Sequence, residues 1–426
     1  MTDLLILTTL DVEGRRNNRE HHAIAHLKSR FDRITVVFRQ RGKMDKPAGR
    51  YLVSGQSYRV QDGVRYVAVD PALNPPEGRV RGITGSDRPG GFGLRRCLAQ
   101  AIDLLGILRD RLTIRALAAA AADEVDAGAN TTVCVAFGPW AATAAHRLRT
   151  AGRIAKFVYV DRDYEPGFVI SFMRRNWAEM NEMRAAAAAD LTFSIGHRLA
   201  ARFADVPGAK VVVSPTGVDS ATFRARQRNE PRPDLIFVGR LAPWSGIEEM
   251  LDAFDFLSDL DPSLTVLGPV EPGYRAYLED RIAASDLGGA VTLMGDQPRD
   301  VVARALEAAS IGSASFRPTP LRIHAAPLKL LEYMAAGLPV IAVEGSETGD
   351  MTLRLGVGLV CKTDGPSLAA TIRTLLAAPA DYRAMSTAGP VAAQDFEWSR
   401  IMAREYDHLS QLYGLGPAPS ARRRRI

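Results

Sequence analysis

The stretch LIFVGRL, residues 235–241, is the most informative run in this sequence. Its first four residues are apolar and predict a short buried strand, which Gly239 and Arg240 follow directly. Gly246 then opens a segment with a helical pattern of apolar residues. A glycine turn between a strand and a helix N-terminus presents backbone N–H groups to an anion, and an arginine adds paired hydrogen bonds. The stretch therefore predicts a diphosphate site, although an ordinary turn with a surface arginine has the same pattern.

Short apolar segments alternate with longer helical patterns along the whole chain. The strands expected in the first half are residues 4–8, 34–38, 64–69, 132–136, 157–160, 191–194 and 211–214. Those expected in the second half are residues 235–238, 264–267, 291–294, 311–315, 340–343 and 358–360. Helical segments between successive strands are typical of parallel sheets covered on both faces. The predicted fold class is α/β, with two Rossmann-like, doubly wound domains facing a central cleft.

The domain borders follow from where this pattern restarts. It restarts after TGVD, residues 216–219, and the charged stretch 224–233 has the composition of a linker. We therefore expect one domain over residues 1–215, a second over 216–395, a closing helix over 396–415 and a basic tail over 416–426. Residues 82–117 are harder to assign and are interpreted as a loop followed by an amphipathic helix. Open parallel sheets bind ligands beyond the carboxyl ends of their strands, so two such sheets predict a site for two substrates.

The composition is that of a globular protein, with 46% hydrophobic and 24% charged residues among 426. A net charge of +6 favours anionic partners, unless it only reflects an arginine-rich and alanine-rich composition. The tail concentrates positive charge at Arg422, Arg423, Arg424 and Arg425. Residues 79–115 do the same, with Arg95, Arg96, Arg109, Arg111 and Arg115. No nucleic-acid-binding pattern of aromatic and basic residues accompanies this charge, so we expect no nucleic-acid partner.

The apolar runs, the N-terminus and the cysteines of the sequence bear on where in the cell the protein is expected. No apolar run approaches the ~20 residues of a membrane span, and the N-terminus has no signal-peptide pattern. Cys97, Cys134 and Cys361 are far apart and lack metal-ligand spacing, so we expect a reduced, cytoplasmic setting and no zinc. The alternation of arginine with leucine and isoleucine over residues 79–115 also fits a peripheral position on an anionic membrane surface.

The segment PLKLLEYMAAGLPV, residues 327–340, carries the second informative pattern. Pro327 suits the first helical position, so Lys329 falls in the first turn, where a cation opposes the helix dipole. A bound phosphate would make that lysine favourable. Glu332 lies three residues later on the same helix face, where its carboxylate can accept hydrogen bonds from ribose hydroxyls. A surface lysine–glutamate pair would have the same spacing.

These motifs occur in order with VSPTGVD at residues 213–219 and FEWS at residues 396–399. Over residues 210–415 the combination resembles the donor domain of GT-B glycosyltransferases, family 4 (glycosyl transferases group 1) in particular. The resemblance implies an acceptor-binding first domain and a second domain that binds a nucleotide-diphosphate sugar, UDP-sugar favoured and GDP-sugar as the alternative. The donor-binding residues that it implies are Gly239, Arg240, Ser245, Gly246, Gly295, His324, Pro327, Lys329, Leu330 and Glu332.

Two positions depart from the family-4 pattern. Ser245 stands where the family usually has lysine, and His324 stands where it often has glutamate. Ser245 keeps a hydrogen-bond donor without the charge, and His324 is either a sugar contact or an ordinary loop residue. These departures leave two rival hypotheses open, a GT-B epimerase of nucleotide sugars and an inactive sugar-binding subunit.

The first half resembles the glucuronosyltransferases of xanthan assembly at Arg15, Arg16 and Asn18, and again at residues 156–159, which lead to Asp163. The resemblance implies that Asp163 is the base that deprotonates the acceptor hydroxyl and that the first-loop residues contact the acceptor. Crowded carboxylates raise one another's pKa, which favours a general base. The other candidates for base or acceptor contact are Asp161, Glu165, His21 and His22.

The resemblance also implies which groups act on the leaving diphosphate. Arg240, Lys329 and two helix N-termini would stabilise it by fixed positive potential. No Asp-x-Asp motif has the context of a metal site, and the nucleotide sugar is a substrate, so we expect no metal ion and no cofactor. The expected acceptor is a glycan, a lipid-linked sugar or a small molecule, in polysaccharide or glycoconjugate biosynthesis or in natural-product tailoring.

Overall fold

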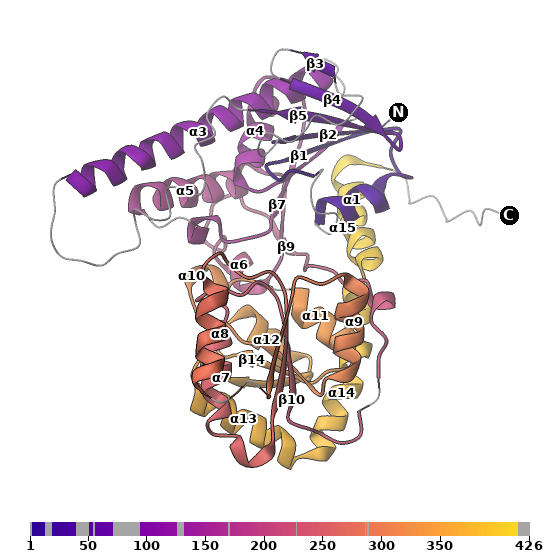
Figure 1. Cartoon of the computed structure of the whole chain (residues 1–426). Coiled ribbons are helices and arrows are strands. Elements are labelled where there is room, and N and C mark those ends of the chain that lie inside the picture. Colours follow the sequence, from indigo (N-terminus) through magenta and orange to yellow (C-terminus); the bar gives the residue numbers. More distant parts are fainter. Residues whose placement is uncertain are drawn as a thin grey trace, which may run out of the picture. The chain divides into compact units, whose positions relative to one another are not determined.

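The computed structural model of the protein describes residues 2–12, 19–39, 51–53, 56–70, 94–125, 132–168, 171–226, 228–285, 287, 289–326 and 328–415. These residues form two compact units, each built on its own sheet (Figure 1). Unit 1 comprises Met1–Ser214 and Met402–Ile426, and unit 2 comprises Pro215–Ile401. The last helix, α15 (Trp398–Tyr413), therefore starts in unit 2 and ends in unit 1.

The described part of unit 1 contains a nine-stranded sheet in the order β3-β4-β5-β2-β1-β6-β7-β8-β9. Its strands are β1 (Asp3–Thr8), β2 (Arg33–Arg39), β3 (Tyr51–Val53), β4 (Gln56–Gln61), β5 (Val64–Val69), β6 (Thr132–Phe137), β7 (Val158–Asp161), β8 (Leu191–Ser194) and β9 (Val211–Val213). Neighbouring strands are parallel, except that β4 pairs antiparallel with β3 and β5. Strand β6 is buried along its whole length, which explains its unbroken run of small and apolar residues.

Helices cover this sheet, and the longest one exceeds the sequence-based expectation. The helices are α1 (Arg19–Leu27), α3 (Leu94–Glu124), α4 (Pro139–Thr150), α5 (Phe172–Ala188) and α6 (His197–Ala201). On α3, Ile114, Leu117 and Ala121 recur at helical spacing and are buried in the core of unit 1. The helix extends past residue 117 because Ala120 and Ala121 continue that buried face.

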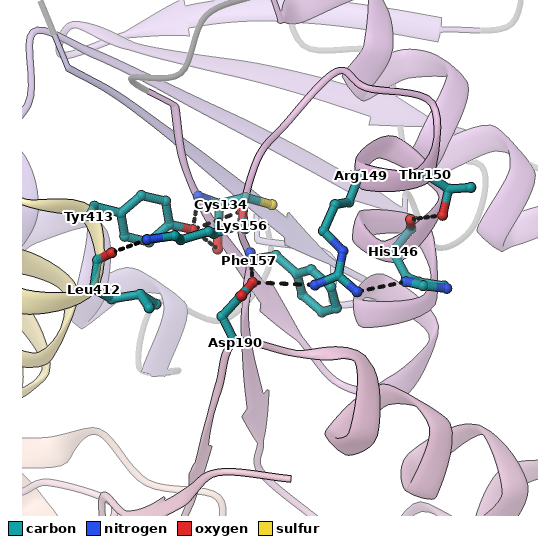
Figure 2. Close-up of polar contacts among 9 residues, drawn as sticks. All are labelled: Cys134, His146, Arg149, Thr150, Lys156, Phe157, Asp190, Leu412 and Tyr413. Atoms are coloured by element: carbon teal, nitrogen blue, oxygen red, sulfur yellow. Dashed lines mark hydrogen bonds and ion pairs between the residues drawn. The ribbon is translucent and has the colours of Figure 1, made fainter. Parts of the chain in front are cut away.

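The end of α15 is anchored in unit 1 through a tyrosine hydroxyl (Figure 2). Tyr413 donates to the Lys156 carbonyl at 2.9 Å and accepts from the Cys134 N–H at 3.2 Å. The Lys156 ammonium donates in turn to the Leu412 carbonyl at 2.7 Å. The last-turn carbonyls of a helix lack partners within the helix, so the lysine caps this end while the tyrosine joins it to β6 and to the start of β7.

Unit 2 contains, among its described residues, a parallel six-stranded sheet in the order β12-β11-β10-β13-β14-β15. Its strands are β10 (Asp234–Val238), β11 (Ser263–Leu267), β12 (Val291–Gly295), β13 (Ile311–Ala314), β14 (Val340–Val343) and β15 (Gly358–Cys361). Its helices are α7 (Ile247–Phe254), α8 (Tyr274–Ala284), α9 (Arg299–Ala308), α10 (Pro320–Ile323), α11 (Leu328–Ala335), α12 (Glu347–Arg354), α13 (Gly365–Ala377) and α14 (Pro379–Ala393). The chain leaves β10 toward β11 on one side and returns to β13 on the other. That reversal of strand order marks the place where such sheets bind ligands, beyond the carboxyl end of β10.

Residues 224–233, which were interpreted as a linker, contain an arginine that joins two helices of unit 2 by hydrogen bonds. Arg228 is buried and donates hydrogen bonds to the carbonyls of Leu306, Ala309 and Ala336 at 2.6, 2.9 and 2.7 Å. These carbonyls lie at the C-terminal ends of α9 and α11, where a cation also complements the helix dipoles. Burial lowers the pKa of the guanidinium to about 10. Residues 224–233 are thus part of unit 2 rather than a spacer. The composition of this stretch did not predict the hydrogen bonds of Arg228.

Tyr333 fixes helix α11 against the end of β10. The β10–β13 ladder covers only Leu235 and Ile236, so the Val238 N–H lies beyond it and donates to the Tyr333 hydroxyl at 2.8 Å. That hydroxyl donates to the Ser313 carbonyl at 3.2 Å, and the side chain is fully buried. Gly312 leaves the space for the ring, since a Cβ there would lie 2.6 Å from Tyr333 Cδ2.

We predict that Tyr333→Phe lowers the free energy of unfolding by about 1–3 kcal/mol, because the buried Val238 N–H loses its acceptor. Denaturant unfolding followed by circular dichroism measures this. Tyr277→Phe is the matched control, because its exposed hydroxyl makes only a 3.3 Å contact with Glu248, so it should change stability by less than about 0.5 kcal/mol. Equal stabilities of the two variants would mean that Tyr333 does not fix α11.

Candidate functional site

A cavity of about 310 Å³ lies in unit 2 at the carboxyl end of β10. Its lining comes from four segments that are distant in the sequence, namely the loop after β10, the loop after β13, α10 with the residues after it, and the first turn of α11. The lining residues are Gly239, Arg240, Trp244, Ser245, Phe316, Arg322, Ala325 and Lys329. Four of these were predicted as donor-binding residues, and the structure brings them together around one cavity.

Glycine allows the loop after β10 to approach its neighbours. Gly246 has a φ of +79°, and a Cβ there would lie 2.8 Å from the backbone nitrogen of Phe316. Any other residue would therefore be strained and would also clash with the backbone of the loop after β13. Gly239 lies beside the cavity, and a Cβ on it would come within 3.6 Å of Lys329 Nζ. The bare backbone at Gly239 leaves this side of the cavity open to a ligand, and Gly246 allows the two loops to pack closely.

The ammonium of Lys329 is the principal charge in the cavity. It lies 3.9 Å from the centroid of the Phe237 ring, and it makes no hydrogen bond or ion pair with any residue that the structure describes. Burial, together with the positive charge of Arg322, lowers the pKa of Lys329 to about 7. A half-buried ammonium without an anionic partner is poised to bind one, since an anion would replace the solvation that the lysine lost.

Two more groups in the cavity have unused hydrogen-bonding capacity. The Ser245 hydroxyl is buried and has no hydrogen-bond partner among the described residues. Arg240 is exposed and, within the same part of the chain, forms no hydrogen bond or ion pair. The guanidinium of Arg322 lies 3.5 Å from the centroid of the Trp244 ring and closes one wall. The cavity thus offers two guanidinium groups, an ammonium and a hydroxyl, all of which can donate to phosphate oxygens.

The carboxylates nearest to this cavity are held by other cations. Glu248 and Glu249 occupy the first turn of α7 and bind Arg317, at 3.0 Å and 2.5 Å respectively. Glu332 lies one turn after Lys329, and its Oε1 is 3.6 Å from Arg299. Burial raises the pKa of Glu332, and the charge of Arg299 opposes that rise. Neither Glu332 nor the α7 carboxylates line the cavity, so its charge is positive.

The remaining predicted donor residues lie outside the lining. Gly295 ends β12 with a φ of +73°, and Leu330 is buried in the apolar core, so only its backbone can face a ligand. His324 caps α10, and its Nδ1 lies 2.6 Å from the Pro320 carbonyl. Pro327 lies outside the described residues. Conversely, the sequence did not identify Trp244, Phe316, Arg322 and Ala325, because only the folded chain brings them to the cavity.

The carboxylates predicted in unit 1 follow β7 and have different environments. Asp161 is only 1% exposed, and its two oxygens accept hydrogen bonds from Tyr159 at 3.1 Å and from Ser194 at 3.0 Å. Burial raises the pKa of Asp161 to about 7, against the effect of these hydrogen bonds. Asp163 and Glu165 are half-buried in the loop beyond the strand. Asp161 therefore forms hydrogen bonds in the interior beneath this loop, whereas Asp163 and Glu165 are partly exposed to solvent.

Arg162 joins this loop to the start of α1. Its guanidinium forms an ion pair with Glu20, which also accepts a 2.9 Å hydrogen bond from the Thr8 hydroxyl. Burial lowers the pKa of Arg162, but the charges of Glu20, Glu165 and Asp163 raise it above its usual value. Three segments that follow or border the carboxyl ends of β1 and β7 thus meet at one edge of the sheet.

Residues 13–18 of the first loop of unit 1 lie outside the described residues, and the predicted acceptor residues Arg15, Arg16 and Asn18 are among them. His21 Nε2 lies 2.7 Å from the Val12 carbonyl and therefore donates to it, while its Nδ1 is buried without a partner in the described structure. His22 is half-buried, and its carbonyl contacts His26 Nδ1 at 2.9 Å.

The described residues contain neither a metal cluster nor a membrane span. Among them, no group of three or more His, Cys, Asp or Glu side chains is placed to hold a metal ion. No helix in those parts of the chain combines the length and the apolar character that crossing a bilayer requires.

Comparison with known proteins relates most of unit 2 to a known family. Residues 219–391 match the family described as glycosyl transferases group 1. The D-inositol 3-phosphate glycosyltransferase of Segniliparus rotundus is 29% identical over 206 residues, which cover 44% of this chain and 44% of that protein. The chain spans just under half the length of the curated relatives that it matches.

Solved structures resemble the chain over almost its whole length. Sucrose-phosphate synthase from Thermosynechococcus elongatus superposes with a TM-score of 0.70 at 17% identity, over 98% of this chain and 100% of that one. The Anabaena protein HepE in complex with UDP superposes with a TM-score of 0.64 at 16% identity, over 96% and 100%. The predicted GT-B fold and the predicted resemblance to group 1 are confirmed. The narrower resemblance of the first half to xanthan glucuronosyltransferases stays a prediction.

The environment of Lys329 predicts an unusual titration. With its lysines reductively ¹³C-methylated, the protein should show one dimethyl-lysine resonance that titrates near pH 7, because burial and Arg322 disfavour the charged form. An NMR pH series measures it, and the resonance should be missing from Lys329→Met. If no lysine resonance titrates below pH 9, the account of a desolvated, unpaired ammonium is wrong.

Proposed function

We propose, on the premise that residues 219–391 match the family of glycosyl transferases group 1, that the chain transfers a sugar from a nucleotide-diphosphate sugar to an acceptor hydroxyl. The observation that carries the proposal is the cavity at the carboxyl end of β10, where Lys329 and Ser245 lack partners among the described residues. A UDP-sugar is the favoured donor, since HepE, which shares the fold, was solved with UDP. The proposed role is in polysaccharide or glycoconjugate synthesis, with tailoring of a small molecule as the alternative.

The leaving diphosphate carries the charge that the cavity is proposed to neutralise. As the bond between the sugar and the diphosphate breaks, negative charge grows on the leaving oxygen. Lys329 Nζ and the Ser245 hydroxyl donate to the diphosphate from fixed positions, and Arg240 approaches it from the exposed side. We propose that these cations perform the neutralisation without a divalent ion. Glu332 is the proposed acceptor for ribose hydroxyls, in exchange for its 3.6 Å contact with Arg299.

Asp163 is the proposed base. It is the half-buried aspartate of the loop beyond β7, whereas the oxygens of Asp161 are occupied in the interior. In the proposed step the acceptor hydroxyl gives its proton to the Asp163 carboxylate while its oxygen bonds to the sugar carbon that the diphosphate leaves. Asp161 is a positioning residue in this proposal, because its hydrogen bond with Ser194 joins β7 to β8.

The proposal predicts proton-linked binding of UDP. At pH 8 the diphosphate is fully ionised while Lys329, with a pKa of about 7, is largely neutral, so bound UDP should raise that pKa and take up a proton. Affinity should therefore fall as the pH rises from 7 to 9. Titration calorimetry in two buffers of different ionisation enthalpy measures the uptake.

Two substitutions test the origin of this effect. Lys329→Met should weaken UDP binding by about 1.5–3 kcal/mol and abolish the uptake, because a charged donor is lost. Lys329→Arg, which stays charged, should bind UDP without proton uptake. Unchanged UDP affinity in Lys329→Met would refute the donor site. UDP binding with sugar conversion but no transfer to any acceptor would favour an epimerase, and binding without turnover would favour an inactive subunit.

Asp163→Asn should reduce kcat by about 10²- to 10⁴-fold with UDP affinity unchanged, since the base is lost and the donor cavity is not. Steady-state kinetics with UDP-sugar panels measures this. Asp161→Asn is the comparison, and it should lower thermal stability more than kcat because that side chain is buried. Near-normal turnover in Asp163→Asn, with activity lost in His21→Ala or His22→Ala, would assign the base to the first loop.

We also propose that unit 1 rests on an anionic membrane surface. On α3, Leu104 and Leu105 are 58% and 55% exposed, and on the neighbouring α5, Phe172 is 75% exposed (Figure 1). The two helices contact each other at Gly106, next to which Arg174 lies. Apolar side chains of this size, flanked by arginine, suit the boundary of lipid headgroups and acyl chains. Such docking would bring the enzyme to a lipid-linked acceptor.

Sedimentation with vesicles tests this. The protein should sediment with anionic vesicles at low salt and less so at high salt, because basic residues near the surface each contribute on the order of 1 kcal/mol. Leu104→Asn/Leu105→Asn should reduce binding, whereas Val391→Asn, an equally exposed residue of α14, should not. No binding to anionic vesicles at low salt would remove the membrane from this account.

A further inference from the structure

Unit 1 contains a second and larger cavity, of about 700 Å³, between α3, α4 and α5. Five arginines line it, contributed by all three helices. They are Arg111 and Arg115 of α3, Arg147 and Arg149 of α4, and Arg184 of α5. No carboxylate of the described residues is among its lining side chains. The concentration of one sign of charge around one hollow sets this cavity apart from an ordinary helical surface.

This cavity is remote from the edge of the sheet where the acceptor is proposed to bind. Helix α4 follows β6 and leads to β7, which is parallel to β6, so α4 begins at the carboxyl edge and ends near the amino edge. Arg147 and Arg149 lie in its last turn. Helix α5 connects the parallel strands β7 and β8 in the same way, and Arg184 lies in its second half. These arginines are therefore too far from the carboxyl edge of the sheet to take part in the proposed transfer reaction.

Most of these guanidinium groups lack a counter-charge. Arg111, Arg115, Arg147 and Arg184 form no hydrogen bond or ion pair with other residues that the structure describes. Arg149 alone has a carboxylate, since its Nη1 lies 3.4 Å from Asp190 (Figure 2). Like charges held around one hollow repel one another, and each of them favours an anion at its centre.

Trp177 gives the cavity an apolar wall with one unsatisfied donor. Its ring stacks on Trp140 with centroids 6.3 Å apart and an angle of 17°, and the Arg111 guanidinium lies 5.0 Å from its centroid. The indole Nε1 is buried and has no hydrogen-bond partner in the described structure. The wall of the cavity therefore combines guanidinium groups with an aromatic surface.

We propose that this cavity binds a ligand with at least two phosphate groups, in addition to the donor that unit 2 binds. Guanidinium groups bind phosphate through paired hydrogen bonds, and several of them around one hollow match several phosphates. The volume is that of a small-ligand site. The same chemistry exists in a soluble sugar bisphosphate and in a phosphorylated lipid headgroup, and the experiment separates the two sources.

His146 lies at the rim and reports on occupancy. Its Nδ1 accepts a hydrogen bond from Arg149 Nη2 at 3.3 Å, which requires a neutral ring, and burial together with Arg149 lowers the pKa of His146 (Figure 2). An anion beside Arg149 offsets that positive charge, so occupancy raises the pKa of His146. The other charged groups that face the ring are the arginines of the cavity and Asp190, whose carboxylate is bound to Arg149 and to the Phe157 N–H.

The test uses fructose 1,6-bisphosphate as the soluble probe and phosphatidylinositol 4-phosphate vesicles as the lipid probe, both with the full-length protein saturated with UDP. Calorimetry gives affinity, and a ¹H–¹³C NMR pH series on the histidines gives the pKa of His146. We expect one probe to bind and to raise that pKa. Arg147→Gln/Arg184→Gln should weaken binding about tenfold or more, since two charged donors are lost.

Arg354→Gln/Arg383→Gln removes the same charge from exposed positions of unit 2 and should change affinity less than about twofold. Binding of the bisphosphate assigns a soluble ligand. Vesicle binding that raises the pKa of His146 and is weakened by Arg147→Gln/Arg184→Gln, with no binding of the bisphosphate, assigns a lipid headgroup. Equal weakening by both double variants, or no change in the pKa of His146 at saturation, would overturn the proposal. UDP affinity should be the same in all variants. UDP binding therefore tests the donor site in unit 2 independently of the cavity in unit 1.

Discussion

The feature of unit 2 on which the proposed chemistry depends is an ammonium group, that of Lys329, which has no anionic partner among the described residues. Lys329 lies in the first turn of α11, where the helix dipole opposes a cation, and only the Phe237 ring contacts its charge among the described residues. Tyr333, one turn later, holds that helix through the Val238 N–H and the Ser313 carbonyl. Burying this lysine lowers the stability of the fold, because its ammonium loses solvation. A bound diphosphate would offset that loss.

The two units use the carboxyl edge of a parallel sheet in different ways. In unit 2 the edge after β10 collects positive charge, and Gly246 lets the loop approach the backbone of Phe316. In unit 1 the edge after β7 collects carboxylates, with Asp161 buried beneath the accessible Asp163. The proposed sugar transfer requires cations for a leaving diphosphate and a carboxylate for an acceptor hydroxyl, and in that proposal unit 2 provides the cations and unit 1 the carboxylate.

Most of the strands, and four of the residues that line the cavity at the carboxyl end of β10, were predictable because they depend on local sequence patterns. Unbroken apolar runs such as β6 identify buried strands, and a lysine in the first turn of a helix, as at Lys329, indicates an anion through its order in the chain alone. The walls contributed by Trp244 and Arg322 were not predictable, since their contact joins two loops that are distant in the sequence. For the same reason Arg228 was interpreted as part of a linker, and the arginines of α4 and α5 were not identified as candidates for a site. Periodicity shows which face of a helix is buried but not which helices meet.

The most direct test of the central claim is a crystal structure of the protein with UDP. The account predicts that the diphosphate occupies the cavity at the carboxyl end of β10, with its oxygens within hydrogen-bonding distance of Lys329 Nζ and the Ser245 hydroxyl. The lysine should then turn from the Phe237 ring toward the phosphates. UDP bound elsewhere, with this cavity empty and Lys329 still against Phe237, would contradict the account.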